Sequence, residues 1–263
     1  MIDLNEVNWE SVSIFSTNPL LLITGHGFGV IMDHNTDSFN LNAMWIADNY
    51  NFSLAALVMT NSNNAEVLLD YGAGMGTHSA QLRQMGAHVI CVEPDDTCRR
   101  NLIDLGFEAH ESIDSIPECS VPYIIALNVL EHIEDDREAV KLLHKKLIPG
   151  GRLFIFVPAF KVLFSSMDRK VGHVRRYSRT KLTGLLTETG FTIEKAHYYD
   201  CLGFFATLLF KIFGNDSGDM NLTALRIFDK IIFPISRRLD ILFKFFLGKN
   251  ILAVAIRQEQ PKG

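Results

Sequence analysis

The stretch Val67-Leu-Leu-Asp-Tyr-Gly-Ala-Gly-Met-Gly76 decides how this chain folds. A short apolar run ends in an acid, Asp70, and glycines follow at alternate positions before a segment of helical composition, 77–85. Glycine lets the backbone adopt positive φ and approach a ligand, while a helix start presents unpaired N–H groups and a positive dipole end. We therefore expect a strand, a tight turn and a helix, with a ligand at the carboxyl end of the strand.

Two kinds of nucleotide site compete for this turn, and a plain tight turn is the third alternative. The dinucleotide fingerprint requires a third glycine three residues after the second, but Thr77 stands there. An acid followed by G-x-G-x-G instead resembles motif I of class I S-adenosylmethionine-dependent methyltransferases. The residues after the turn must decide between these alternatives.

Composition narrows the classes of protein to consider. The chain has 263 residues, 48% of them apolar, and a net charge of −5, which argues against a general nucleic-acid binder. Its four cysteines have no metal-ligand spacing, so we expect no metal and reduced thiols in a cytoplasmic protein. The N-terminus lacks the features of a signal peptide, and no stretch reaches the roughly 18 apolar residues of a membrane span.

From Ala65 onward, short apolar runs alternate with segments of helical composition, which predicts a parallel sheet with crossover helices. The apolar runs are continuous, as in strands covered on both faces. The second run ends in Glu93, where a carboxylate can accept hydrogen bonds from both hydroxyls of a ribose. Such an acid suits NAD and S-adenosylmethionine equally, and an acid exposed at the end of a strand is the plain alternative. The expected strands are 66–70, 87–93, 107–110, 123–128, 152–157, 190–199 and 251–258.

A second motif discriminates better. Asn128-Val-Leu-Glu-His-Ile-Glu-Asp-Asp136 is followed by an L-x-P-G-G turn at Leu147–Gly151. Over about 65–193 the chain is similar in matching order to the type 11/12 family of class I methyltransferases, although Pro122-Tyr123 replaces the usual acid before the fourth strand. The resemblance implies an α/β, doubly wound, Rossmann-like mixed sheet of seven strands, with the last strand antiparallel.

The resemblance also implies which residues bind S-adenosylmethionine. It places some at the methionine end of the cofactor, Glu93 at the ribose and two residues beside the adenine. Listed in that order, the cofactor-binding residues are Asp70, Gly72, Gly74 and Asn128 at the methionine end, Glu93 at the ribose, and Ser112 and Ile113 at the adenine.

The segment after the fifth strand is dense in polar groups, among them Asp168, His173 and the run Arg175-Arg176-Tyr177. Two guanidiniums and a tyrosine can clamp a phosphate or carboxylate, and a histidine can take a proton from a hydroxyl or an amine. We therefore expect His173 to be the catalytic base and the Arg-Arg-Tyr run to bind substrate, together with His132. A solvated basic loop, and for His132 a packed or capping role at a helix start, are the alternatives.

About 50 residues, 201–250, separate the sixth and seventh strands, where the family usually has a short turn. Residues 1–200 carry a net charge of −9, whereas residues 201–250 carry +3 and include many phenylalanines. Aromatic apolar faces with nearby Lys and Arg suit an interfacial helix on an anionic membrane. A helical subdomain that packs on the core or forms a dimer contact is the alternative.

Together these features predict an enzyme that transfers a methyl group from S-adenosylmethionine to a small or lipid-linked acceptor, without metal or nucleic acid. A catalytically silent scaffold at a membrane and a nicotinamide-dependent oxidoreductase are the rival functions. The protein is expected in the cytoplasm, with the inner face of a membrane as a further partner, and the sequence gives no oligomeric state. The expected organisation is an extension with a helix (1–64), the core (65–200), an apolar basic helical insertion (201–250), and a last strand with a tail (251–263).

Overall fold

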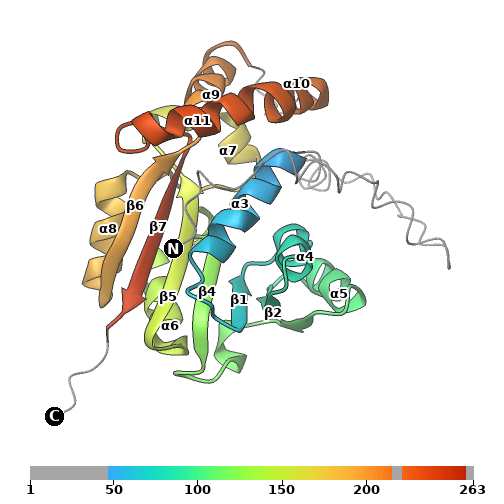
Figure 1. Cartoon of the computed structure of the whole chain (residues 1–263), viewed down its shortest axis with the longest axis vertical. Coiled ribbons are helices and arrows are strands. Elements are labelled where there is room, and N and C mark those ends of the chain that lie inside the picture. Colours follow the sequence, from blue (N-terminus) through green and yellow to red (C-terminus); the bar gives the residue numbers. More distant parts are fainter. Residues whose placement is uncertain (1–46, 215–220, 259–263) are drawn as a thin grey trace. The chain divides into compact units, whose positions relative to one another are not determined.

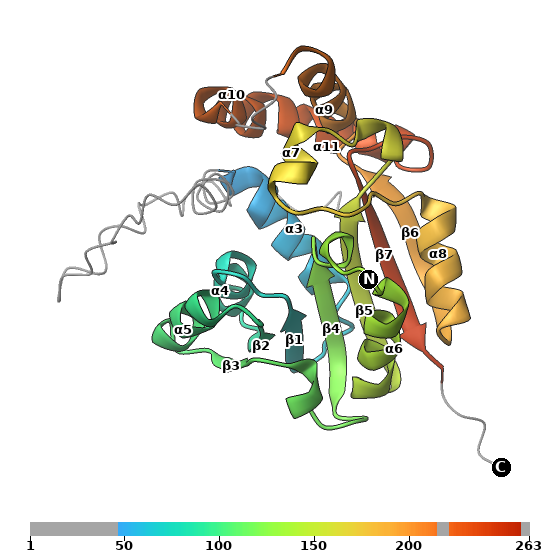
Figure 2. The same cartoon turned by 180° about the vertical axis from the view of Figure 1, so that it is seen from behind.

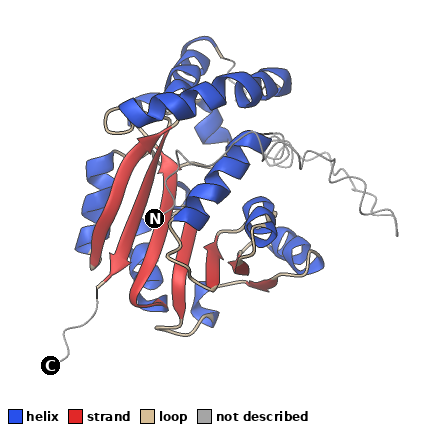
Figure 3. Ribbon diagram, viewed as in Figure 1, coloured by secondary structure: helices blue, strands red, loops and turns tan. Residues whose placement is uncertain are grey.

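A seven-stranded sheet organises the protein (Figures 1 and 3). The computed structural model describes residues 47–214 and 221–258. The strands lie in the order β3-β2-β1-β4-β5-β7-β6, all parallel except β7, which runs antiparallel to both of its neighbours. This confirms the predicted mixed, doubly wound sheet. The strands are β1 (Val67–Tyr71), β2 (His88–Val92), β3 (Glu108–His110), β4 (Val121–Leu127), β5 (Leu147–Pro158), β6 (Phe191–Tyr199) and β7 (Asn250–Arg257).

Helices cover both faces of this sheet, as Figure 2 shows from behind. One face packs against α6 and α8, and the other packs against α3, α4 and α5. The helices are α3 (Asp48–Thr60), α4 (Thr77–Gln84), α5 (Asp96–Asp104), α6 (Asp136–Lys146), α7 (Ser166–Lys170), α8 (Arg179–Glu188), α9 (Cys201–Phe213), α10 (Leu222–Ile227) and α11 (Phe233–Phe243). Short 3₁₀ turns are η3 (Ile113–Ser115), η4 (Leu130–His132) and η5 (Lys161–Leu163), and a π-helical turn, η6 (Phe228–Ile232), joins α10 to α11.

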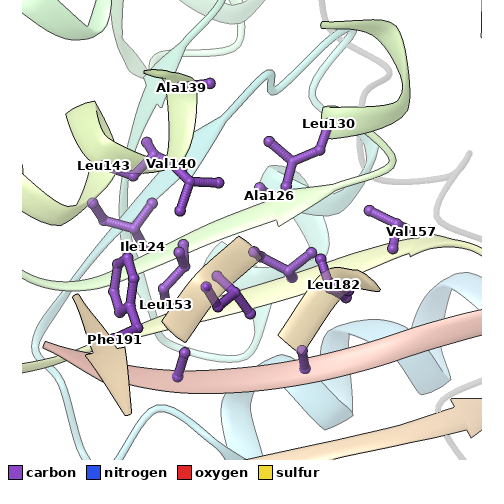
Figure 4. Close-up of a cluster of buried hydrophobic side chains, with 14 of the residues drawn as sticks. Ile124, Ala126, Leu130, Ala139, Val140, Leu143, Leu153, Val157, Leu182 and Phe191 are labelled. Atoms are coloured by element: carbon purple, nitrogen blue, oxygen red, sulfur yellow. The ribbon is translucent and has the colours of Figure 1, made fainter. Parts of the chain in front are cut away.

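The sheet divides the hydrophobic core into two clusters, and β4 contributes side chains to both of them. Ile124 and Ala126 point to the face of α6 and α8, whereas Tyr123 and Ile125 point to the face of α3. This alternation is the period of two that a strand imposes on its side chains. Figure 4 shows the first cluster, in which Leu143 of α6 and Leu182 of α8 close over the strands. Because both faces are buried, the strands read as continuous apolar runs.

Three local features differ from the expectations. β4 begins at Val121 and includes Pro122-Tyr123, so the unusual start of this strand is accommodated within the sheet. The predicted Leu147–Gly151 turn is part of the long strand β5, because Leu147 pairs with Val121 across a register shift. The short helix α7 replaces what reads as a loop in the sequence. Of the expected N-terminal extension, 1–64, residues 1–46 lie outside the described residues.

The inserted segment between β6 and β7 is helical, formed by α9, α10, η6 and α11. It leaves the sheet at Asp200, whose backbone takes the left-handed conformation and whose carboxylate caps α9. Asp240 of α11 accepts hydrogen bonds from the backbone N–H groups of Asp200 and Cys201, which ties the two helices together. Phe233 reaches the core, so part of the segment packs on the sheet as the subdomain alternative expects. In the described part of the chain, no helix is long and apolar enough to cross a membrane.

Candidate active site at the carboxyl edge of the sheet

The glycines of the turn after β1 are required for different physical reasons. A Cβ on Gly72 would lie 2.6 Å from a methyl carbon of Val129, and one on Gly76 would lie 2.8 Å from a methyl carbon of Leu102. Gly76 also begins α4 in the left-handed conformation, with no side chain capping the helix. A Cβ on Gly74 would meet nothing within 4 Å. The turn is therefore packed tightly at two glycines and open at the third, which leaves space for a ligand against the backbone.

Asp70 ends β1 beneath this turn with its side chain buried. Its carboxylate accepts a hydrogen bond from the Ser79 hydroxyl at 2.6 Å. Burial raises the pKa of Asp70 to about 6, because the Ser79 hydrogen bond only partly offsets desolvation and the nearby Glu93 adds repulsion. No Lys or Arg pairs with Asp70 in the described residues. A positively charged ligand group at the turn would therefore be stabilised strongly.

Glu93 follows β2 and turns back toward the same glycines. One of its oxygens accepts the Gly74 N–H at 2.7 Å, and the other accepts the Asp95 N–H at 2.9 Å. Each carboxylate oxygen retains a further lone pair for a ligand hydroxyl. Two buried acids, an open glycine and an uncapped helix start thus surround one site, which fits a nucleoside that carries a cationic group.

The remaining predicted cofactor residues flank this centre. Asn128 follows β4 with φ of 54°, a left-handed conformation that asparagine tolerates better than most residues. Ser112 follows β3 and caps η3 through its hydroxyl, while Ile113 is buried in the core. All of them follow the carboxyl ends of parallel strands of the sheet, but the predicted contacts of Ser112 and Ile113 with adenine stay predictions.

A second constellation of polar groups lies after β5, on the segment that we call the acceptor loop (residues 159–177). Asp168 of α7 is 1% exposed and accepts two hydrogen bonds from the Arg176 guanidinium, at 2.8 and 3.0 Å. It also accepts one from His173 Nδ1 at 2.8 Å and caps α7 through the Ser165 N–H. Burial alone would raise the pKa of Asp168, but the hydrogen bonds from His173 and Arg176 outweigh it and hold the pKa at about 2.

This pairing fixes which nitrogen of the His173 ring carries a proton. The ionised Asp168 can only accept hydrogen bonds, so Nδ1 of His173 is a donor, and the tautomer with a lone pair has it on Nε2. Nε2 lies 3.8 Å from a carboxyl oxygen of Glu131. Glu131 is fully buried, and neither of its carboxyl oxygens has a hydrogen-bond partner among the described residues. Burial raises the pKa of Glu131 to about 8, so it retains its proton at neutral pH.

His132 stands beside this pair, with its ring 4.7 Å from that of His173 in an edge-on arrangement. Partial desolvation by the surrounding groups, and secondarily His173, lower the pKa of His132, although the residue as a whole is exposed. Within the described residues, Glu131, His132 and His173 form the group whose side-chain ligand atoms could hold a metal ion, all within 4.8 Å of one another. The structure therefore brings two predicted residues, His132 and His173, to one place and adds Glu131 to them.

The Arg-Arg-Tyr run does not form an open anion clamp. Arg176 is committed to Asp168 and to the carbonyl of Ala159, and the Tyr177 hydroxyl donates to Asp136 at 2.6 Å. Arg175 pairs with the same Asp136 at 2.7 Å and with the carbonyl of Glu134. Because acids of the protein already occupy these donors, the three side chains hold the acceptor loop in place.

The sequence predicts no role in the site for Asp168, and for Glu131 only a position near its mouth beside His132. A sequence signal existed for Asp168, because Ser165-x-x-Asp168 has the spacing of a capping box, which the structure contains. For Glu131 the sequence offered only its place beside His132. Its isolation from hydrogen-bond donors depends on the loop that folds over it, since Val174 N–H binds the Glu131 carbonyl at 2.8 Å.

The strand order and the glycine turn define the class I methyltransferase fold, with S-adenosylmethionine as its cofactor. The family model described as "Methyltransferase domain" matches residues 46–196, more than half of the chain, and the chain belongs to that family. The resemblance to type 11/12 methyltransferases is confirmed. Among curated proteins, methyltransferase gedG of Aspergillus terreus is 30% identical over 99 residues, which cover 35% of this chain and 31% of that protein. The match thus spans about a third of the curated relative.

Solved structures agree on the fold. A SAM-dependent methyltransferase from Archaeoglobus fulgidus superposes with a TM-score of 0.56 at 16% identity, covering 84% of this chain and 96% of that one. A SAM-dependent methyltransferase from Thermotoga maritima, described as a possible histamine N-methyltransferase, gives 0.56 at 12% identity, covering 84% and 98%. At these identities the likeness extends to the fold and leaves the acceptor open.

Proposed function

We propose that this protein transfers the methyl group of S-adenosylmethionine to an oxygen or nitrogen atom of a small or lipid-linked acceptor. The observation that carries the proposal is the Asp168–His173 pair on the acceptor loop, at the same edge of the sheet as the open glycine turn. In it, the ionised Asp168 accepts a hydrogen bond from Nδ1 of His173, which leaves Nε2 as the ring nitrogen that can accept a proton. A base of this kind is useful when a hydroxyl or amine must lose a proton as it is methylated.

The proposed roles follow from the geometry of both centres. Gly72 and Gly74 bring the backbone to the cofactor, Asp70 faces its cationic methionine end, and Glu93 accepts its ribose hydroxyls. When bound, S-adenosylmethionine supplies a methyl group on a positively charged sulfur. His173 Nε2 would take the proton that an acceptor hydroxyl or amine loses when it is methylated. Alignment of the two reactants supplies most of the acceleration in such a displacement.

Binding of the cofactor product tests the first half of the proposal. Calorimetric titration should show S-adenosylhomocysteine binding and no binding of NADH. A Gly74→Arg substitution fills the open space and should weaken this binding about 100-fold or more, which corresponds to about 2.7 kcal/mol. Gly184→Arg is the matched control, since Gly184 also has open space around its Cβ position but lies in α8. NADH binding in place of the homocysteine product would support an oxidoreductase.

Transfer of labelled methyl groups tests the second half. The protein is mixed with labelled S-adenosylmethionine and a cell extract, and the label is then counted in the aqueous and chloroform-soluble fractions. Label in the aqueous phase indicates a small acceptor, and label in the organic phase indicates a lipid-linked one. His173→Ala should reduce transfer in either fraction at every pH, because the proton acceptor is lost. Cofactor binding without any transfer would instead favour the catalytically silent scaffold.

A further inference from the structure

The helical segment between β6 and β7 exposes a row of large apolar side chains. On α9 the exposed residues recur at i, i+4, i+7 and i+8, which places them on one side of the helix. Phe213, at the end of this row, is 79% exposed. A soluble surface rarely carries so many neighbouring apolar groups without a partner. The row consists of Phe205, Leu209, Ile212 and Phe213.

A second row follows the continuous helical run from α10 through η6 and α11. Its members are spaced by four or seven residues, so they form one stripe along the run. Phe246, just after α11, is 74% exposed, and Leu242 is 69% exposed. The helices α9 and α11 are bound together through Ser236 of α11, whose hydroxyl accepts the Leu202 N–H and donates to Asp200. The stripe consists of Ile227, Ile231, Ile235, Leu242 and Phe246.

In the described part of this segment, the acidic side chains are buried, whereas the exposed charged side chains are basic. Its two acids are buried: Asp229 accepts the Asn49 and Tyr50 N–H groups, and Asp240 binds the start of α9. Its exposed charged residues are all cations. Arg238 falls within the apolar stripe by helical spacing, and Lys230 flanks it. The exposed cations are Lys211, Arg226, Lys230 and Arg238.

This surface is joined to the acceptor loop. The Lys211 ammonium donates to the carbonyl of Val162 at 2.6 Å, and Phe204 packs edge-on against Phe160. Figures 1 and 2 show α9, α10 and α11 at the end of the sheet where β6 ends, beside α7. A partner on this surface would therefore lie next to the loop that carries Asp168 and His173.

We propose that α9, α10 and α11 form a docking surface for an anionic lipid membrane. Exposed phenylalanine, isoleucine and leucine with interspersed Lys and Arg match the interfacial zone of such a membrane, where apolar groups enter the acyl boundary and cations meet lipid phosphates. A second copy of the chain fits less well, because two cationic faces would repel each other and lysine is depleted at protein interfaces. This proposal does not depend on methyl transfer.

Vesicle flotation of the full-length protein tests the proposal. Phosphatidylcholine vesicles that contain phosphatidylglycerol should bind the protein about tenfold or more tightly than vesicles of phosphatidylcholine alone, and high salt should weaken this binding. Leu242→Ser with Phe246→Ser should reduce binding to the anionic vesicles about tenfold or more. Lys230→Glu with Arg238→Glu should also reduce it and remove the preference for phosphatidylglycerol. Each variant should bind S-adenosylhomocysteine as the unchanged protein does, which shows that it is folded.

The controls come from α5, on another part of the surface. Ile103 is 54% exposed, so Ile103→Ser matches the apolar substitutions, and Arg100→Glu matches the charge reversals. Both controls should leave vesicle binding unchanged. Three results would overturn the proposal: no binding to anionic vesicles, equal loss in the controls, or self-association that the Leu242→Ser, Phe246→Ser variant abolishes without any vesicle binding. The last result would identify a second copy as the occupant.

Discussion

The buried acid beside the turn after β1 and the buried acid in the acceptor loop after β5 have different partners, and their pKa values shift in opposite directions. Among the described residues, Asp70 pairs with a hydroxyl alone, and its pKa rises to about 6. Asp168 is paired with Arg176 and His173, and its pKa falls to about 2. In the described part of the chain the first acid has no cationic partner, which suits a site whose ligand brings positive charge. The second acid is neutralised within the protein, which suits a part whose task is to hold a histidine in position.

The largest expected effect concerns the acceptor loop. Asp168→Ala leaves the Arg176 guanidinium buried without its partner, and loss of one member of a buried pair costs about 3–5 kcal/mol. Urea unfolding at pH 7 should show this loss. Glu138→Ala, an exposed acid on α6, should change stability by less than about 0.5 kcal/mol. Binding of S-adenosylhomocysteine should be nearly unchanged, because Asp70 and Glu93 are untouched. A loss of binding as large as the loss of stability would show that the two regions are not separable.

Glu131 gives the next effect, through the dependence of stability on pH. Its pKa is raised from 4.5 to about 8 on folding, so its contribution to stability is complete below about pH 4.5 and is lost as the pH rises through 8. Between pH 5 and 9 this loss amounts to about 4 kcal/mol. Glu131→Gln removes this titration, so its unfolding free energy should vary less between pH 5 and 9. Parallel pH profiles of the two proteins would contradict a buried, protonated Glu131.

The Glu131→Gln variant also tests whether this centre holds a protonated Glu131 or a metal ion. With Glu131 protonated at pH 7, we expect Mn²⁺ to leave the melting temperature of both proteins unchanged. A saturable Mn²⁺ effect that Glu131→Gln abolishes would instead make Glu131, His132 and His173 metal ligands, and His173 would then be unable to act as the base through Nε2.

A substitution of Asp70 should have a smaller effect, and it should change stability and cofactor binding in opposite directions. Its pKa is raised from 3.8 to about 6 on folding, so the protein loses about 2–3 kcal/mol from this group as the pH rises from 4 to 7. Asp70→Asn should therefore be more stable than the unchanged protein at pH 7, yet bind S-adenosylmethionine more weakly. Thermal unfolding and calorimetry at pH 5 and 7 measure both quantities. Lower stability at pH 7 would show that the carboxylate is compensated within the protein.

The difference between the two regions also explains what the sequence could predict. Asp70, the glycines and Glu93 lie at strand ends within about 25 residues, so local patterns locate them. The tasks of Arg175, Arg176 and Tyr177 depend on Asp136 and Asp168 across loops, and the same residues read equally well as an anion clamp. No local sequence pattern predicts that the Glu131 carboxyl lacks hydrogen-bond donors. This depends on how the acceptor loop packs over it. The exposure of the apolar row on α9 and of the stripe along α10 to α11 likewise depends on tertiary packing, which decides which helix faces stay uncovered.

The smallest effect concerns the contact that joins the acceptor loop to the turn bearing Glu131. The Tyr177 hydroxyl donates to Asp136 at 2.6 Å and lies 3.2 Å from the Leu130 carbonyl. Tyr177→Phe removes this bridge but keeps the buried ring, so stability should fall by about 1 kcal/mol. Tyr198→Phe is the matched control, since the Tyr198 ring stacks on Phe160.

If Tyr177 positions the loop, its loss should also lower the rate of methyl transfer while the affinity for S-adenosylhomocysteine stays the same. Single-turnover measurements with labelled cofactor separate these quantities, because rate and binding are read in different experiments. An unchanged rate with the expected loss of stability would confine Tyr177 to a structural role. A weaker affinity would show that the acceptor loop also shapes the cofactor turn.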